Sequence, residues 1–320
     1  MMAFIGRLVR WPNLLIMALT MGLMHYGIFR PLYRSAALTF SGDYHAGFFL
    51  LLAIVLTTAA AGYIVNDLHD LDEDRINNKC RGLIGEKLSE TLVWKIYGWL
   101  NFFSLLLALA LSLYIRYIPI FMIVAGVQML LYIYSRYLKS GILLGNLLVA
   151  VMPALMILLL FFTEALFRAG ASGWFSFPCE TEVKGLAVTV FYAGFAFFTG
   201  VIREIIKDIE DVRGDRAVGH KTLVVVYGEQ SSRYTASGFL VALLIGLSVY
   251  IVWLIHLQVF LVAVYLLVFT FIPLLWLGLR LQKSLRAKEE ALLLQQRLRI
   301  IMLAGVLSLA LYSLSGHIPV

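Results

Sequence analysis

The chain has 320 residues, of which 61% are hydrophobic and only 14% are charged. Soluble domains are nearer half apolar and a quarter charged, so this composition excludes an ordinary soluble protein and a disordered chain. The net charge of +7 is expected of a membrane protein with basic loops, and no soluble basic segment carries exposed stacking aromatics, so we expect no nucleic-acid partner.

Nine apolar runs follow one another along the chain. Each is close to the length of about 20 residues that an α-helix needs to cross a bilayer. None alternates with the period of two that marks a membrane β-barrel. The sequence therefore predicts an all-α membrane protein with nine transmembrane helices, at residues 11–31, 45–66, 92–114, 117–134, 141–163, 185–206, 233–255, 258–279 and 298–315.

The basic residues predict how these helices are oriented. If the N-terminus is cytoplasmic, 21 of the 26 Lys and Arg residues lie on the cytoplasmic side and 5 lie outside. Such an excess is the positive-inside signal of membrane proteins. We therefore expect a multi-pass protein of the cell membrane, in contact with its lipids, whose N-terminus is cytoplasmic. Cys80 and Cys179 then lie on opposite sides and cannot pair within one chain.

The acidic residues gather in two places. Seven of the 19 lie between residues 67 and 90 and six lie between residues 204 and 229, both on the predicted cytoplasmic side. In each segment three aspartates are spaced three and four residues apart, which places them on one face of a helix. The second set follows the first at a constant offset of 141 positions, so we predict a single domain, 1–320, with two related halves, about 1–140 and 141–320. The two sets are Asp67, Asp70 and Asp74, and Asp208, Asp211 and Asp215.

Two acidic faces at one end of a helical bundle indicate a cation between them, because carboxylates stacked on one helix face repel one another. Mg²⁺ takes oxygen ligands and commonly binds through a few carboxylates and the phosphates of a substrate. This arrangement suits the ionisation of an allylic diphosphate, whose departing diphosphate carries growing negative charge. The alternative is that the acids are solvated charges paired with Arg75, Lys207 or Arg213.

The acidic motifs also resemble those of a known family. The first segment reads N-D-x-x-D-x-x-x-D from Asn66, and the second reads D-x-x-x-D from Asp211. Both are similar to the two motifs of the UbiA superfamily of intramembrane prenyltransferases, and the resemblance covers nearly the whole chain. It includes the shorter matches Arg10-Trp-Pro-Asn13, Tyr134-Ser135 with Lys139, and Gly145-Asn146. It departs after the first motif, where many relatives have Arg-Pro and this chain has Arg81-Gly82.

The resemblance implies a ring of nine helices around a central cavity that opens laterally to lipid, with an isoprenyl diphosphate held at the cytoplasmic mouth. The six aspartates would be catalytic and would hold two Mg²⁺ ions together with the amide oxygen of Asn66. Candidates to contact the diphosphate are Asn13, Asn66, Arg81, Lys139, Lys207 and Lys221. The three lysines could instead be residues that only set the membrane orientation.

The acceptor is indicated by the segment around the second motif. Residues 207–215 read K-D-I-E-D-x-x-G-D, which is most similar to the digeranylgeranylglyceryl phosphate synthases of the superfamily. This resemblance implies transfer of a geranylgeranyl group from geranylgeranyl diphosphate to the lipid geranylgeranylglyceryl phosphate, with the bases near 213–221 available for the phosphate of the acceptor. The alternative acceptor is an aromatic quinone or menaquinone precursor.

A membrane transporter is the alternative from another functional class, because acids within membrane spans often mark ion paths. Transport sites tend to lie near the middle of the bilayer, at broken helices. The acids of this chain fall at the ends of predicted spans, which favours the enzyme.

Overall fold

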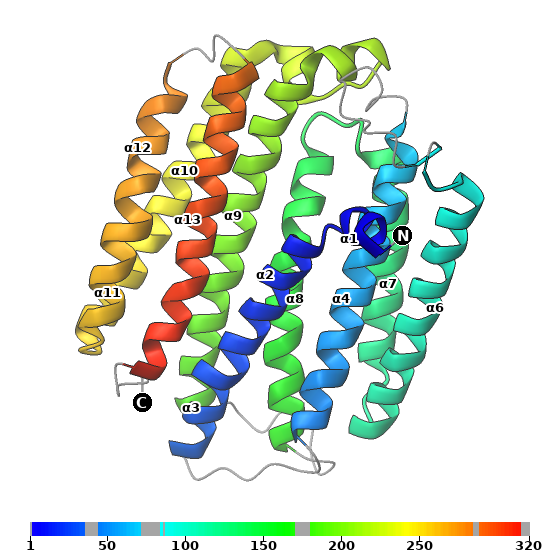
Figure 1. Cartoon of the computed structure of the whole chain (residues 1–320). Helices are drawn as coiled ribbons and strands as arrows, with labels where there is room; N and C mark the ends of the chain where they lie inside the picture. The colour runs from blue at the N-terminus through cyan, green and yellow to red at the C-terminus, as the bar shows by residue number, and fades with distance from the viewer. Residues whose placement is uncertain are drawn as a thin grey trace.

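The structure, a computed structural model, describes residues 2–35, 44–71, 84–85, 87–169, 180–283 and 288–314. These residues are almost entirely helical (Figure 1). The helices are α1 (Met2–Leu8), α2 (Trp11–Met24), η1 (His25–Phe29), α3 (Arg30–Ser35), α4 (Tyr44–His69), α6 (Glu90–Ile115), α7 (Pro119–Ile133), η2 (Tyr134–Leu138), α8 (Leu144–Ala169), α9 (Glu180–Ala217), α10 (Leu223–His256), α11 (Phe260–Leu266), η4 (Leu267–Phe271), α12 (Ile272–Leu281) and α13 (Lys288–Leu314).

Nine helical stretches within the described ranges are long and apolar enough to cross a membrane. Three of these stretches contain a single π-helical turn, η1, η2 or η4, that continues the neighbouring α-helices. Such turns insert one extra residue into an α-helix and are frequent at functional sites. The predicted all-α architecture with nine spans is therefore confirmed, whereas the orientation of the N-terminus stays a prediction.

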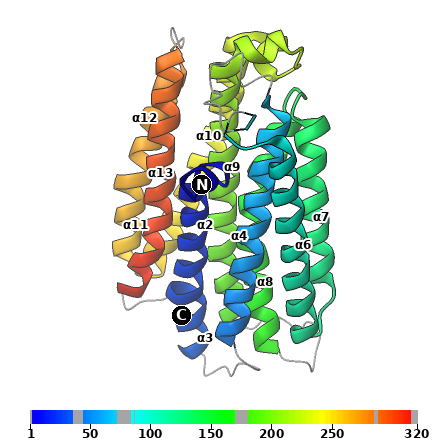
Figure 2. The same ribbon diagram turned by 45° about the vertical axis from the view of Figure 1, so that its right-hand side comes forward.

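The spans form two groups that are joined into a closed arrangement. The helix α4 packs against α6 and α7, and α9 packs against α8, α10 and α13. The helix α2 closes the arrangement because it contacts α4 on one side and α13 on the other, so the first and last spans are neighbours (Figures 1 and 2). The two helices that carry the acidic motifs, α4 and α9, thus belong to different groups.

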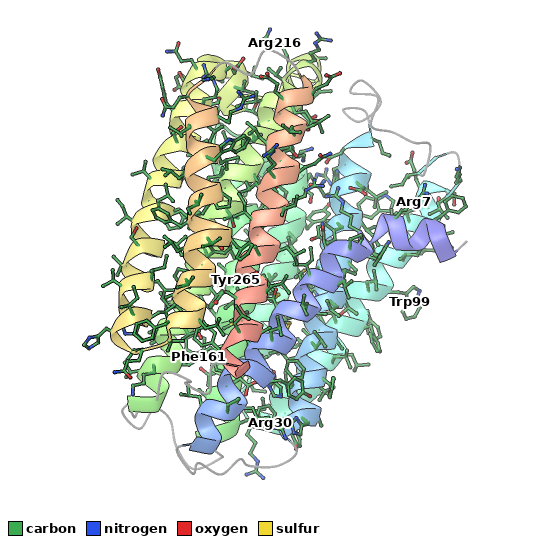
Figure 3. All side chains as sticks on the ribbon, turned by 60° about the vertical axis from the view of Figure 1, so that its left-hand side comes forward. Arg7, Arg30, Trp99, Phe161, Arg216 and Tyr265 are labelled. Carbon is green, nitrogen blue, oxygen red and sulfur yellow. The ribbon has the colours of Figure 1, made fainter. Side chains whose placement is uncertain are left out.

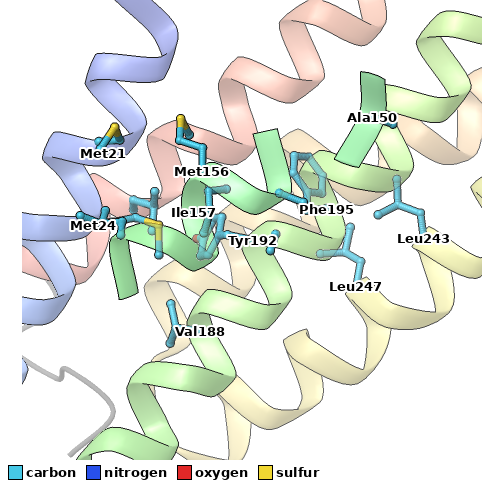
Figure 4. Packing of buried hydrophobic residues seen from close by; sticks show 14 of the residues in the cluster. Met21, Met24, Ala150, Met156, Ile157, Val188, Tyr192, Phe195, Leu243 and Leu247 are labelled. Carbon is cyan, nitrogen blue, oxygen red and sulfur yellow. The ribbon is translucent and has the colours of Figure 1, made fainter. Parts of the chain in front are cut away.

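The apolar core lies where these helices meet. Figure 4 shows side chains from α2, α8, α9 and α10 in contact, among them Met24, Ile157, Phe195 and Leu247. Many apolar side chains instead face outward, as Trp99 does with 70% of its surface exposed (Figure 3). An apolar outer surface on a bundle whose backbone is hydrogen-bonded within helices is what a lipid solvent requires.

Several helices extend beyond the predicted spans. The helix α9 has 38 residues and runs through the second acidic motif to Ala217, and α13 starts at Lys288, ten residues before the predicted span. The helix α10 starts at Leu223 and is kinked at Gly228, whose φ of 82° is a left-handed conformation that suits glycine. The predicted spans were shorter because apolar runs report the thickness of the bilayer, whereas polar helical turns continue past it.

Candidate functional site

The last turn of α4 presents the first acidic motif. Asp67 lies inside this turn, and Asp70 directly follows the helix with its N–H donating to the Asn66 carbonyl. The Asn66 side-chain amide donates to Asp70 Oδ2 at 2.6 Å, and Lys139 Nζ lies 2.5 Å from Asp70 Oδ1. The two oxygens of Asp70 are therefore held by one amide and one ammonium, at the end of the bundle that we call the polar end.

The second acidic motif lies on α9 at the same end. Asp208, Asp211 and Asp215 all line one polar pocket, as their spacing predicts. Asn146, near the start of α8, donates to Asp208 Oδ2 at 2.7 Å, and Thr222 donates to Asp215 Oδ2 at 3.1 Å. The motif is thus held from α8 and from the turn that leads into α10.

The pocket joins the second motif to residues of three other segments. Its lining residues are Tyr134, Lys139, Asn146, Glu204, Lys207, Asp208, Asp211, Asp215, His220 and Thr222. Lys139 lines this pocket and pairs with Asp70 of the first motif. The charge of Lys207 interacts most strongly with Glu204, and also with Asp70 of the first motif and Asp211 of the second. Its ammonium makes no ion pair within 4.0 Å with any residue of the described ranges. The structure therefore brings both motifs together around a buried lysine.

Arg10 faces the first motif from the opposite side. Its Nη2 lies 2.5 Å from Asp67 Oδ1, and its guanidinium lies 5.2 Å from the centre of the Tyr63 ring. Partial burial disfavours the charge of Arg10, but the Asp67 carboxylate outweighs this effect and raises the pKa of Arg10. Its backbone is left-handed, with φ 51° and ψ 53°, which costs a non-glycine residue about 1–2 kcal/mol. The ion pair with Asp67 holds Arg10 in this conformation.

A close backbone approach positions Lys139 and Asn146. The π-helical turn η2 ends at Leu138, and its i→i+5 bond runs from the Lys139 N–H to the Tyr134 carbonyl. A Cβ at Gly145 would lie 2.9 Å from the Leu138 carbonyl oxygen, closer than real Cβ atoms come to backbone. Glycine at this position therefore allows α8 to start against η2 and places Asn146 beside Asp208.

Seven of the predicted site residues are not among those that line this pocket. Three of them, Asn66, Asp67 and Asp70, belong to the first motif described above, and the other four lie elsewhere in the chain. Asn13 is half-buried in the first turn of α2, where its N–H donates to the Arg10 carbonyl at 2.8 Å. Lys221 is exposed, and its backbone N–H donates to the Ser140 carbonyl. Asp74 and Arg81 lie outside the described residues. The functional roles predicted for these residues remain predictions.

Several residues at the polar end had no role assigned from the sequence. Asn146 and Tyr134 belonged to short matches with the family, and Arg10 belonged to another, but spacing alone gave no contact for them. Glu204 precedes Asp208 by one helical turn and continues the same acidic face of α9. Its spacing from Asp208 could therefore have identified it as a site residue. His220 and Thr222 reach the pocket only because the chain reverses between α9 and α10.

The donor set fits a hard metal ion. The acidic residues of the two motifs supply carboxylate oxygens, and Asn66 and Asn146 supply amide oxygens, which are the ligands that Mg²⁺ prefers. Within the described ranges no three His, Cys, Asp or Glu side chains are already arranged around a common point. The reason is visible in the contacts: Arg10, Lys139 and Asn146 each engage one of the carboxylates.

The sequence profile of the UbiA prenyltransferase family matches residues 28–302, which is most of the chain. The chain belongs to the UbiA prenyltransferase family. This finding confirms the family inferred from the two acidic motifs.

Curated relatives within the UbiA family carry a consistent name. The chain is 33% identical over 197 residues to a digeranylgeranylglyceryl phosphate synthase of Thermococcus sibiricus, over 62% of each protein. It is 30% identical over 196 residues to a digeranylgeranylglyceryl phosphate synthase of Sulfurisphaera tokodaii, over 61% of this chain and 63% of the relative. The matched region thus spans somewhat less than two thirds of the length of these relatives.

Solved structures of UbiA proteins share the fold. A digeranylgeranylglyceryl phosphate synthase structure superposes with a TM-score of 0.65 at 20% identity and covers 98% of both chains. A UbiA homologue from Archaeoglobus fulgidus bound to GPP and Mg²⁺ superposes with a TM-score of 0.61 at 16% identity, over 97% of this chain and 99% of that one. At these identities the likeness establishes the nine-span UbiA fold.

Proposed function

We propose that this protein is a Mg²⁺-dependent prenyltransferase that transfers a geranylgeranyl group from geranylgeranyl diphosphate to geranylgeranylglyceryl phosphate. The observation that carries the proposal is the meeting of two acidic motifs, from α4 and α9, around Lys207 and Lys139 at one end of an apolar bundle. Support for the metal comes from the UbiA homologue that binds GPP and Mg²⁺. Support for the acceptor comes from the name shared by the curated relatives.

The acidic residues of the site are proposed to bind metal, and the basic residues are proposed to bind the diphosphate. Asp67, Asp70, Asp208, Asp211 and Asp215, with Asp74 and Asn66, are proposed to hold two Mg²⁺ ions. When bound, Mg²⁺ neutralises the negative charge that grows on the departing diphosphate.

Lys207 and Lys139 are placed to bind the diphosphate oxygens as point charges. Asn13, Arg81 and Lys221 remain further candidates for diphosphate contact, although Asn13 and Lys221 do not line the described pocket.

Transfer itself needs no nucleophilic side chain. The bond between the allylic carbon and the diphosphate oxygen breaks, and the acceptor hydroxyl oxygen bonds to that carbon and releases its proton. Aromatic side chains can stabilise the intervening cation through their π faces. Tyr134 is an aromatic residue in the lining of the pocket and is proposed for this role. An active site on the cytoplasmic side of the cell membrane completes the proposal.

The proposal is tested by turnover. Purified protein with labelled geranylgeranyl diphosphate and Mg²⁺ is offered geranylgeranylglyceryl phosphate, 1,4-dihydroxy-2-naphthoate and 4-hydroxybenzoate in parallel. We expect a doubly prenylated glycerol phosphate as the main product. If an aromatic acid is the acceptor that turns over fastest, the acceptor is a quinone precursor and not geranylgeranylglyceryl phosphate. Turnover of none of the three, also with shorter and longer prenyl diphosphates, would contradict the proposal.

A further inference from the structure

Three arginines from separate parts of the chain converge beside the first acidic motif. Arg10 precedes α2, Arg203 lies on α9 and Arg299 lies on α13. The charge of Arg203 interacts with those of Glu204 and Arg10. The charge of Arg299 interacts with those of Arg203 and Arg10 and with the carboxylates of Glu204 and Glu210. The three guanidinium groups, which we call the arginine trio, thus lie within electrostatic reach of one another, with Glu204 and Glu210 beside them.

A hydrogen bond between helices fixes this arrangement. Gln295 on α13 donates from Nε2 to Glu210 Oε2 on α9 at 2.7 Å. Arg299 follows Gln295 by one helical turn on the same face of α13, and Arg203 precedes Glu210 by two turns on the same face of α9. Because α9 and α13 run antiparallel (Figure 1), both steps lead in the same direction along the bundle. Arg299 and Arg203 therefore face a common space.

One member of the arginine trio is not paired with an acid among the described residues. Arg10 pairs with Asp67, and Arg203 donates from Nε and Nη2 to Glu204 Oε1 at 3.1 and 2.6 Å. Arg299 has no ion pair or hydrogen bond with any side chain in the part of the chain that the structure describes. Side-chain exposure of 42% for Arg10 and 30% for Arg203 leaves the trio accessible. Converging guanidinium groups with one unpaired member indicate an anion site.

We propose that the arginine trio binds the phosphate monoester of the acceptor lipid. This inference rests on the function proposed above and specifies which residues select its acceptor. Guanidinium groups match a phosphate because their paired N–H donors form two parallel hydrogen bonds with two of its oxygens. Arg10 contacts Asp67 of the first acidic motif directly, so a phosphate held by the trio lies next to the site of diphosphate departure.

The location also suits a lipid substrate. The glycerol hydroxyl that receives the prenyl group is only a few bonds away from the phosphate, so both must lie near the reacting carbon. The trio lies where α2 meets α4 and α13, at the junction of the first and last spans, and the apolar tail of the acceptor can remain between these helices and lipid. Arg213, Arg216 and Lys221, the bases in the segment assigned to this phosphate from the sequence, are all exposed and do not line the pocket.

Arg299→Gln is the most informative variant, because Arg299 is exposed and makes no ion pair whose loss would disturb folding. The KM is measured for geranylgeranylglyceryl phosphate, for its unphosphorylated counterpart geranylgeranylglycerol and for geranylgeranyl diphosphate. We expect the KM for the phosphorylated acceptor to rise about tenfold, the effect of one charge-assisted hydrogen bond. The KM values for the other two substrates should stay within about twofold, because neither carries a phosphate monoester.

Arg297→Gln is the matched control. Arg297 is an exposed arginine of the same helix, but its guanidinium lies 4.3 Å from the centre of the Trp276 ring of α12, away from the trio. This variant should keep all three KM values. An equal loss in both variants, an equal loss for phosphorylated and unphosphorylated acceptors, or a rise only in the KM for geranylgeranyl diphosphate would each overturn the inference.

A binding measurement separates this inference from the proposed function. Affinity for geranylgeranylglyceryl phosphate is measured without Mg²⁺ by the thermal shift of the purified protein. If wild-type protein binds the lipid and Arg299→Gln binds it about tenfold more weakly, the phosphate site stands even where turnover is absent and the proposed function fails. Equal binding by both proteins, or no binding by either, overturns the phosphate site whatever the turnover.

Discussion

Three carboxylates at the polar end, those of Asp67, Asp70 and Asp208, are held by side chains that are distant in the sequence. Asp67 contacts Arg10, which is 57 positions away, and Asp208 contacts Asn146, which is 62 positions away. The spacing of the acids predicted a common helix face because helical periodicity is local. It could not predict these partners, because they depend on how α2, α4, α8 and α9 pack.

A second buried polar pair lies within the opposite part of the bundle. His25 Nδ1 lies 2.5 Å from Glu164 Oε1, and the exposed fractions of the two side chains are 0% and 3%. His25 Nε2 lies 3.5 Å from His45 Nδ1, and the His25 ring stacks on Phe48. The pair connects η1 to α8, so it ties the first span to the fifth.

Glu164→Ala is predicted to destabilise the protein. It removes the carboxylate partner of a fully buried imidazole, which costs about 3 kcal/mol when one member of a buried pair is lost. The measurement is thermal unfolding of the purified protein in detergent. Glu164→Gln keeps an oxygen that can accept from His25 and should recover most of the loss. Unfolding of Glu164→Ala at the wild-type temperature would contradict a stabilising role for the pair.

At the scale of elements, the site depends on how closely α8 starts against η2. Gly145→Ala would place a methyl group 2.9 Å from the Leu138 carbonyl oxygen and 3.2 Å from Lys139 Cα. Both contacts are with backbone, so the segment must shift, at a cost of about 1–3 kcal/mol. The shift moves Lys139 from Asp70 and Asn146 from Asp208. We expect lower thermal stability together with slower prenyl transfer.

Gly126→Ala is the matched control for this prediction. Gly126 lies within α7, and an added Cβ there meets no atom within 4 Å. Alanine is the better helix former by about 0.5–1 kcal/mol, so this variant should keep its activity and lose no stability. If Gly145→Ala behaved like Gly126→Ala in both measurements, the close approach of α8 and η2 would not be what positions Lys139 and Asn146.

The sequence predicted the elements better in their apolar parts than at their ends. Apolar runs located all nine spans because lipid-facing and core-facing side chains are both apolar. The spacing of the second set of aspartates predicted a helix there, but the apolar run ended at residue 206, so the single 38-residue helix α9 that joins both was not predicted. The kink at Gly228 was likewise hidden, since its left-handed backbone is a property of the fold.

At the scale of the whole molecule, the ring unites two groups of helices and places one acidic helix in each. The constant offset of 141 positions between the two motifs still predicts two related halves, and the excess of bases on one side still predicts a cytoplasmic polar end. The site takes residues from both α4 and α9, and both statements about the whole molecule stay predictions. The central claim is therefore that carboxylates of both helices act together through Mg²⁺.

The most direct test of that claim is the Mg²⁺ dependence of prenyl transfer by Asp70→Ala and Asp211→Ala, one variant for each acidic helix. We measure the rate of labelled product formation from geranylgeranyl diphosphate across a Mg²⁺ titration, in protein that unfolds at the wild-type temperature. The control is Glu90→Gln, an exposed acid at the start of α6, which should keep the wild-type rate and Mg²⁺ dependence. We predict that each aspartate variant loses a factor of about 10² or more in rate, as is usual when a group that stabilises transition-state charge is removed. Wild-type rates and an unchanged Mg²⁺ dependence in either aspartate variant would contradict the claim.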